Sequence, residues 1–370
     1  MNRPPRVLVS GYYGFGNAGD EAILAGLVAG IRGLTPAPEL TVLSGDPAAT
    51  EAEHGARAAP RGLISAYRLS RQSDLLVSGG GGLLQDLTSW RSPLYYLGVL
   101  RLARAAGLPV ACIGYGVGPL RRRFVRGLAR RELSRVEAVA VREAASAAAL
   151  RELGLERPVE VTADLAFLLP RPTAEEVDRA WEKAGLPRGE RPAAAIALRP
   201  APERRTGRDL AARLGRAIGT ACDHLGLDPV LVPMQRTRDI EFASLVSAGM
   251  PSATQVVGGE MSARDLLAVI GGCELVVAMR LHALVFAAIC GVPPVAISYD
   301  PKVDGLMGQL GLQSATSIGR LDEEALGRVI SQTWESRSRL SARLTPRVEK
   351  LREAAGRNIE LVRRLLADRH

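Results

Sequence analysis

The chain has 370 residues, 47% hydrophobic and 24% charged, a composition that excludes a disordered protein. Its length exceeds one ordinary domain and suits two domains of about 150 to 200 residues each. The net charge of +9 admits an anionic partner such as nucleic acid, a membrane surface or a phosphorylated substrate.

The four cysteines form no C-x-x-C pair and lie in apolar segments, which predicts reduced core thiols in a cytoplasmic protein and no zinc site. The N-terminal sequence enters a predicted strand without an apolar signal segment. The longest apolar stretch starts at Ala283, extends for about 15 residues and contains two prolines, so we expect no membrane-spanning segment.

Short β-branched runs alternate with helical patterns along the whole chain. Such runs, apolar on both faces and each followed by a helix, predict parallel sheets covered by helices, and hence an α/β protein. The predicted strands are 6–10, 40–44, 75–79, 110–114, 137–141 and 159–163, then 194–198, 229–233, 254–258, 274–278 and 294–298.

We therefore expect two α/β domains. The expected divisions are a first domain at 1–170, a linker at 171–192, a second domain at 193–335 and a C-terminal helix at 336–370. Within the linker, Thr173 suits the N-cap of a short helix. In the C-terminal segment, Thr345 and Pro346 suit an N-cap and a first helical position.

Two glycine-rich loops follow predicted strands of the first domain. The first, GYYGFGNAGDEAIL (11–24), suits either a phosphate cradle or a structural turn, and its spacing does not fit NAD binding well. The second, SGGGGLLQD (78–86), allows close approach of a backbone or a ligand, and we expect its last two residues to lie in the next helix. The residues that we expect to contact substrate are Gly16, Asn17, Asp20, Gly80, Gly81 and Asp86.

Cationic residues follow three predicted strands of the second domain. Arg280 and His282 lie in MRLHALVFAAICG (279–291), where a buried strand meets a helix. A core histidine is the alternative interpretation, but an arginine two residues earlier favours an anion nearby. Arg199 and Lys302 follow two other strands, and cations converging at one sheet edge suit a small phosphorylated carboxylic acid, although Lys302 also fits a surface lysine.

The segment RRRFVRGLARRELSR (121–135) contains seven arginines and one glutamate. Its apolar positions predict a helix with one inner face, formed by Val125, Leu128, Ala129 and Leu133. The exposed face suits either plain solvation or contact with anionic lipid or a lipid-linked diphosphate.

Six segments occur in an order that resembles the polysaccharide pyruvyltransferases of the CsaB type. They are GYYGFGNAGDEAIL, SGGGGLLQD, VREAAS (141–146), TADLAF (162–167), MRLHALVFA and YDPKV, and the resemblance spans residues 6–310. It implies a GT-B-like fold, with two Rossmann-like domains facing an interdomain cleft and a C-terminal helix that crosses back.

The resemblance also implies a reaction, in which pyruvate moves from phosphoenolpyruvate onto a sugar as a 4,6-linked ketal. CsaB-type members act on a lipid-linked disaccharide, which implies N-acetylmannosamine on undecaprenyl diphosphate, a cell-wall polymer and S-layer anchoring. Phosphoenolpyruvate is then a co-substrate, and we expect no metal and no other cofactor. An anionic membrane surface is a further expected partner, which implies a peripheral location on the inner face of the cell membrane.

Carried over segment by segment, the resemblance implies roles for single residues. Arg280, Leu281 and His282 correspond to the phosphoenolpyruvate-binding signature, and Arg199 to a second arginine that holds carboxylate or phosphate. The residues implied to be catalytic are His282, Lys302 and Arg142.

Two other classes of protein compete with this interpretation. A nucleotide-sugar glycosyltransferase on the same fold needs groups for a base and a ribose, for which 232–242 offers weak candidates. A nucleic-acid binder explains the net charge but not Arg280 and His282 within apolar sequence, so we expect no nucleic-acid partner.

Overall fold

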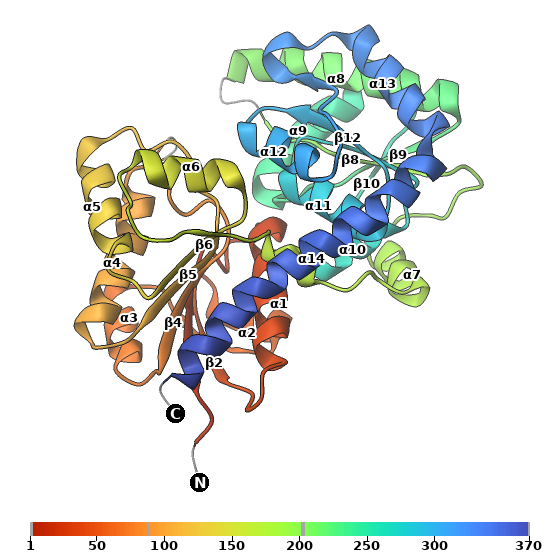
Figure 1. The fold of residues 1–370 in the computed structure, drawn as a ribbon. Helices are drawn as coiled ribbons and strands as arrows, with labels where there is room; N and C mark the ends of the chain where they lie inside the picture. Colours follow the sequence, from red (N-terminus) through yellow and green to blue (C-terminus); the bar gives the residue numbers. More distant parts are fainter. Residues whose placement is uncertain (1–2, 87–88, 201–203, 369–370) are drawn as a thin grey trace. The chain divides into compact units, whose positions relative to one another are not determined.

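The computed structural model describes residues 3–86, 89–200 and 204–368, and it divides the chain into two compact units (Figure 1). The first unit comprises residues 1–15, 20–169 and 350–370, and the second comprises residues 16–19 and 170–349. Each unit is built on a parallel sheet with helices on both faces, which confirms the predicted α/β class.

The first unit contains a seven-stranded sheet in the order β3-β2-β1-β4-β5-β6-β7. Its strands are β1 (Arg6–Ser10), β2 (Glu39–Ser44), β3 (Arg57–Pro60), β4 (Leu75–Gly79), β5 (Val110–Tyr115), β6 (Ala138–Val141) and β7 (Glu160–Val161). Its helices are α1 (Ala18–Arg32), α2 (Pro47–His54), α3 (Leu63–Ser70), α4 (Arg91–Ala105), α5 (Arg123–Leu133) and α6 (Ala144–Glu152), with a 3-10 turn at Leu165–Leu168. Helices α3, α4 and α5 form a layer on one face of the sheet, and α1 and α2 cover the other (Figure 1).

The second unit contains a six-stranded sheet in the order β10-β9-β8-β11-β12-β13. Its strands are β8 (Ala193–Ala197), β9 (Asp228–Leu231), β10 (Gln255–Val256), β11 (Leu275–Ala278), β12 (Pro294–Ser298) and β13 (Thr316–Ser317). Its helices are α7 (Ala174–Lys183), α8 (Arg204–Leu225), α9 (Arg236–Ala248), α10 (Ala263–Gly271), α11 (Leu281–Cys290), α12 (Pro301–Gln309) and α13 (Glu323–Glu335), with a 3-10 turn at Ile318–Arg320. As in the first unit, the strand order reverses beside the first strand, which is the topology of a Rossmann-like sheet.

Two strands were not predicted from the sequence, and both lie at the edge of their sheet. β3 has the sequence RAAP and is only partly buried, and β13 has two residues at a sheet edge. Neither shows the apolar run of a central strand, because an edge strand buries less of its surface. The helix predicted after Thr173 is present as α7, where Thr173 and Glu176 form a capping box.

The last helix, α14 (Arg337–Ala367), begins earlier than Thr345 and Pro346 suggested. Pro346 lies inside it, and the Thr345 hydroxyl donates to the Ser341 carbonyl within the helix instead of capping it. Buried Leu344 and Val348 flank the proline, so packing stabilises the helix where the proline removes one hydrogen bond.

The C-terminal part of α14 belongs to the first unit. Asn358 is fully buried there, and its side-chain oxygen accepts from the Gly114 amide at 3.1 Å and from the Thr162 hydroxyl at 3.0 Å. Its amide nitrogen donates to the Ala163 carbonyl. These bonds fix the tail of the chain to the ends of β5 and β7.

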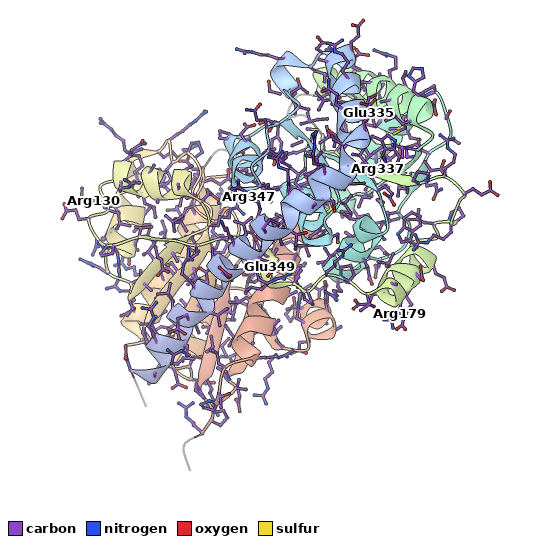
Figure 2. The ribbon with its side chains drawn as sticks, turned by 45° about the vertical axis from the view of Figure 1, so that its right-hand side comes forward. Arg130, Arg179, Glu335, Arg337, Arg347 and Glu349 are labelled. Atoms are coloured by element: carbon purple, nitrogen blue, oxygen red, sulfur yellow. The ribbon has the colours of Figure 1, made fainter. Side chains whose placement is uncertain are left out.

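None of the helices in the described part of the chain combines the length and the apolar character that crossing a membrane requires. Charged side chains cover much of the surface, and Arg130 of α5 points away from its unit (Figure 2).

Candidate functional site

The predicted cations of the second unit lie after three adjacent strands. β8, β11 and β12 are neighbours in the sheet, and their carboxyl ends are followed by Arg199, Arg280 and Lys302, respectively. In a doubly wound sheet this edge is where ligands bind. The fold therefore brings these residues to one sheet edge from positions about 100 residues apart in the sequence.

Arg199 and Lys302 meet at the ring of Tyr299, a residue that follows β12 directly. The Arg199 guanidinium carbon lies 4.5 Å from the ring centroid, and Lys302 Nζ lies 5.4 Å from it. Burial raises the pKa of Tyr299, but the charges and hydrogen bonds of Lys302 and Arg199 outweigh burial, so its pKa lies below the ordinary value. This corner of the unit is therefore positively charged and stabilises a negative group.

Lys302 lies in the first turn of α12, with Asp300 as the N-cap. The Asp300 carboxylate accepts from the Lys302 backbone N–H at 3.1 Å and lies 3.6 Å from Nζ in a half-exposed ion pair. Such a pair is weak, because water screens both charges. The Lys302 ammonium group therefore remains able to bind an anionic ligand.

Arg280 lies between β11 and α11 and has an anionic partner within the protein. The Asp239 carboxylate of α9 accepts from Arg280 Nε at 3.0 Å and also from one terminal nitrogen. Asp239 is 1% exposed and accepts as well from the Gln235 amide. The side chain of Arg280 is thus held in one orientation, while its other terminal nitrogen bonds to no residue in the described part of the chain.

His282 is the second residue of α11, so it lies at the positive end of that helix dipole. It packs against Gly19, which belongs to the second unit by its contacts. A Cβ atom on Gly19 would overlap the imidazole Nδ1, so only glycine allows this approach. Beside it, the Ala18 amide donates to the Met234 carbonyl at 2.9 Å. Leu281, between Arg280 and His282, is buried and supports the helix start.

The two glycine-rich loops of the first unit pack on helix α1. Gly80 and Gly81 both have positive φ, and a Cβ on Gly81 would lie 2.6 Å from the Asp20 carboxylate. A Cβ on Gly80 would overlap Ile23. Because Gly80 and Gly81 have no side chains, α1 can pack closely against this loop. Gly16 and Asn17 precede α1 and belong to the second unit by their contacts. A Cβ added to Gly16 would meet no atom within 4 Å, and the Asn17 side chain accepts from the Gly19 amide at 3.3 Å.

Arg142 lies in the first unit and is 5% exposed. It donates to Glu143 at 2.8 Å and to Asp164 at 2.9 Å, so the segments VREAAS and TADLAF are joined by a buried ion pair. Burial lowers the pKa of Arg142, but the two carboxylates outweigh it and raise the pKa above its ordinary value. Its predicted catalytic role stays a prediction.

Asp86 does not lie in a helix, contrary to the prediction, because α4 begins only at Arg91. Its carboxylate instead accepts from the Arg121 and Arg122 backbone amides, both at 2.8 Å, directly before α5. Burial raises the pKa of Asp86, but these two bonds and the arginine charges outweigh it and leave the pKa below its ordinary value. Asp86 thus fixes the start of the arginine-rich helix.

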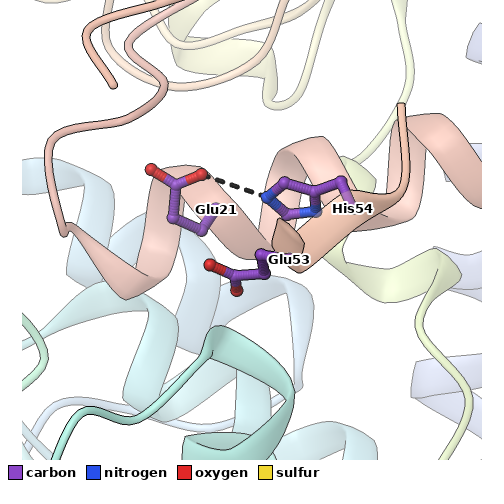
Figure 3. Close-up of side chains that lie close together, drawn as sticks. All are labelled: Glu21, Glu53 and His54. Carbon is purple, nitrogen blue, oxygen red and sulfur yellow. Dashed lines mark hydrogen bonds and ion pairs between the residues drawn. The ribbon is translucent and has the colours of Figure 1, made fainter. Parts of the chain in front are cut away.

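Glu21, Glu53 and His54 form a further cluster of ionisable side chains in the first unit (Figure 3). Their ligand-type atoms lie within 4.8 Å of one another, a spacing that also suits a divalent cation. Both oxygens of Glu21 already have partners, since one accepts from the Gly14 amide at 2.8 Å and the other lies 3.2 Å from His54 Nε2. We therefore interpret the cluster as a support for the first glycine-rich loop.

Sequence reasoning missed Asp239, Tyr299 and Asp164 as partners of the predicted residues. Tyr299 is the first residue of the segment YDPKV, and Asp164 lies inside TADLAF, so their positions were the available signal. Asp239 lies in a different strand-helix unit from Arg280, and nothing in the local sequence links the two.

The fold places this chain among proteins with two Rossmann-like sheets of GT-B-like architecture. A UDP-GlcNAc 2-epimerase from Neisseria meningitidis is similar, with a TM-score of 0.64, 10% identity and coverage of 98% of this chain and 100% of that chain. Anabaena HepE, solved with UDP-glucose, gives a TM-score of 0.64 at 14% identity, covering 98% of each chain. A glycosyltransferase from Rickettsia africae gives 0.60 at 10% identity, covering 100% of this chain and 97% of that one. At these identities the likeness concerns the fold alone.

The family is shown by sequence. A family model described as polysaccharide pyruvyl transferase matches residues 17–301, so this chain belongs to that family. The Erwinia amylovora amylovoran biosynthesis protein AmsJ is 26% identical in a 260-residue alignment that covers 67% of this chain. The match spans 62% of the length of that relative.

Proposed function

We propose that this protein transfers pyruvate from phosphoenolpyruvate to a sugar, on which it forms a ketal with two hydroxyl groups. The observation that carries the proposal is the meeting of Arg199 and Lys302 at Tyr299, on the sheet edge that also holds Arg280. Phosphoenolpyruvate presents a carboxylate and a phosphate close together, and such a pair suits two arginines and a lysine. Membership of the polysaccharide pyruvyl transferase family supports the same donor.

The residues that we propose to bind phosphoenolpyruvate have two tasks. One residue orients the molecule, and two others neutralise the charge of its phosphate. Arg280, fixed by Asp239, presents its remaining terminal nitrogen in a set direction and orients the carboxylate. Arg199 and Lys302 bind the phosphate, where Arg199 pairs with no carboxylate of the described residues and Lys302 has only a screened one. The amide groups at the start of α11 add partial positive charge.

The reaction forms two C–O bonds at C2 of phosphoenolpyruvate, the first by addition and the second by displacement of phosphate. In the first, a sugar hydroxyl adds to C2 while C3 accepts a proton. In the second, another hydroxyl of the same sugar attacks C2, phosphate leaves with the electrons of its C–O bond, and a base accepts the hydroxyl proton. His282 is the group that handles these protons, because an imidazole exchanges a proton near neutral pH. Lys302 stabilises the charge of the departing phosphate.

The acceptor that we propose is a lipid-linked cell-wall precursor, with the 4,6-ketal on N-acetylmannosamine of an undecaprenyl-diphosphate disaccharide. The likeness of six segments to CsaB-type members supports this choice, as it supports a role in S-layer anchoring. A lipid-linked acceptor requires the enzyme to reach a membrane, which we take to be the inner face of the cell membrane. The acceptor residues we propose are those of the two loops: Gly16, Asn17, Asp20, Gly80, Gly81 and Asp86.

The experiment that tests the proposal is incubation of the protein with phosphoenolpyruvate and lipid-linked saccharide, followed by mass analysis of the saccharide. We expect the mass of the saccharide to increase by one pyruvic acid less one water, with release of one phosphate for each ketal formed. Arg199→Ala should reduce both products together. Glycosyl transfer from a UDP-sugar without pyruvyl gain would instead support a glycosyltransferase.

A further inference from the structure

The layer formed by α3, α4 and α5 in the first unit exposes an unusual share of apolar side chains. Seven large hydrophobic residues are exposed in the described part of the chain, and five lie on or directly beside these three helices. The five, which we call the apolar patch, are Leu63, Ile64, Tyr67, Trp90 and Phe124. A soluble surface rarely gathers such side chains without a partner.

Four of the five side chains lie at the N-terminal ends of their helices, and Tyr67 lies in the middle of α3. Leu63 and Ile64 are the first two residues of α3, Trp90 is the N-cap of α4, and Phe124 is the second residue of α5. In a parallel α/β unit, helices begin at the carboxyl edge of the sheet. The apolar patch therefore lies on the part of the layer nearest the edge that carries the two glycine-rich loops.

The most exposed members of the apolar patch are Ile64 and Phe124. Ile64 is 87% exposed and Phe124 is 53% exposed. Trp90 and Phe124 touch edge to face, with ring centroids 5.9 Å apart, and so join the starts of α4 and α5. The Arg91 and Arg122 guanidinium carbons each lie 5.6 Å from the Trp90 ring centroid.

The charge of the same layer has one sign. Helices α3, α4 and α5 contain eight arginines and one acidic residue, Glu132. Glu132 is 1% exposed and pairs with Arg104 at 3.0 Å, so it does not reach the surface. The layer thus combines exposed aromatic and aliphatic side chains with uncompensated arginines.

We infer that this layer is a membrane-docking surface that binds an anionic lipid bilayer through the apolar patch and the arginines around it. Aromatic and aliphatic side chains enter the boundary between headgroups and acyl chains, while arginines bind anionic headgroups. A second copy of this chain fits less well, because a symmetric interface would place the arginines of one copy against those of the other, and facing like charges weaken an interface. Docking of this kind goes beyond the proposed reaction and needs neither donor nor acceptor.

The test is flotation of the full chain with vesicles of phosphatidylglycerol and phosphatidylcholine, compared with phosphatidylcholine alone. We expect binding only to the anionic vesicles, with a strong decrease on added salt. The double variant Ile64→Ser with Phe124→Ser should lower binding by about tenfold or more. Val161→Ser is the matched control, because Val161 is exposed but lies on β7, and its binding should not change.

The arginine contribution is tested at the two ends of one helix. Arg122→Ser with Arg123→Ser removes two charges beside the apolar patch, and Arg130→Ser with Arg135→Ser removes two from the far end of α5. The first pair should lower vesicle binding by about tenfold, and the second by clearly less. Equal losses would mean adsorption by net charge alone and would overturn the inference.

Two further measurements distinguish membrane docking from dimer formation through the apolar patch. Brominated lipid should quench tryptophan fluorescence in the wild-type chain and quench it less in Trp90→Phe. If the apolar patch instead joins two copies of this chain, sedimentation without lipid will show a dimer that Ile64→Ser with Phe124→Ser dissociates, and the inference is wrong. Vesicle binding without pyruvyl transfer would leave the docking surface intact and refute only the proposed reaction.

Discussion

Asp239 holds Arg280 through two hydrogen bonds to the same guanidinium group, although Asp239 lies in α9 and Arg280 directly before α11. The buried carboxylate therefore compensates the arginine charge and sets its direction. In the donor site that we propose, Asp239 is therefore expected to position Arg280 without contacting the substrate itself.

Replacing Asp239 should affect both stability and donor binding. Asp239→Ala leaves a largely buried guanidinium without its partner, which costs about 3–5 kcal/mol in the free energy of unfolding. Glu324→Ala removes an exposed ion pair with Arg328 in the same unit and should cost about 0–1 kcal/mol. Urea denaturation of both variants measures the difference.

The milder change Asp239→Asn should keep the fold. It should raise the KM for phosphoenolpyruvate more than it lowers kcat, because the side chain of Arg280 is then held less firmly in its orientation. Arg280→Ala should reduce kcat/KM by about 100-fold or more. Steady-state kinetics with varied phosphoenolpyruvate separates the two effects. Unchanged kinetics in a folded Arg280→Ala protein would exclude Arg280 from the donor site.

His282→Gln should reduce kcat by about 10²–10⁴-fold, the usual size of acid–base catalysis, and largely keep the binding of phosphoenolpyruvate. Calorimetry measures that binding independently of turnover. His224→Gln is the control, since His224 is an exposed residue of α8. Loss of binding with no separate effect on turnover would make His282 a ligand-holding residue instead.

Gly19→Ala should reduce turnover by displacing the imidazole, because the added methyl group overlaps Nδ1 of His282. Gly127→Ala provides the control, since Gly127 also lies in a helix and has open space around it. That change should stabilise the chain by up to about 1 kcal/mol and leave kcat unaltered. Thermal unfolding and kinetics of the two variants check both expectations.

Tyr299 should titrate below the ordinary tyrosine pKa, because Lys302 and Arg199 favour its phenolate. Because the pKa of Tyr299 is lowered in the folded state, its phenolate stabilises the folded chain. This contribution is fully present above the pKa of the unfolded chain and is lost as the pH falls through the folded-state pKa. Lys302→Ala should raise the Tyr299 pKa in an ultraviolet titration, whereas Lys302→Arg should leave it lowered. Both variants should lose activity, since the wider arginine fork does not reproduce the compact ammonium group.

Asp86→Ala should lower the free energy of unfolding by about 1–2 kcal/mol at neutral pH, because two backbone amides lose their acceptor. The pKa of Asp86 is depressed in the folded state, so this stabilisation is present above the unfolded pKa and is lost as the pH falls through the folded value. Asp86→Asn keeps an acceptor and should flatten that pH dependence. Acid denaturation of the three chains measures it.

Much of the fold was determined by local sequence. Apolar runs such as VACIG at the start of β5 predict buried parallel strands wherever they occur, because a strand covered on both faces has no polar side. The capping box of Thr173 and Glu176 likewise acts within four residues. The charges of Arg199, Arg280 and Lys302 were also predictable, since each follows a strand.

The contacts of Arg280 and His282 were decided by the tertiary structure alone. Asp239 reaches Arg280, and Gly19 reaches His282, across segments that sequence distance does not relate. The same holds for Asp86, which lies outside a helix and binds the start of another one. The physical reason is that strand and helix formation depends on periodicity along the chain, whereas compensation of a buried charge depends on which side chains the packed sheet brings within hydrogen-bonding distance.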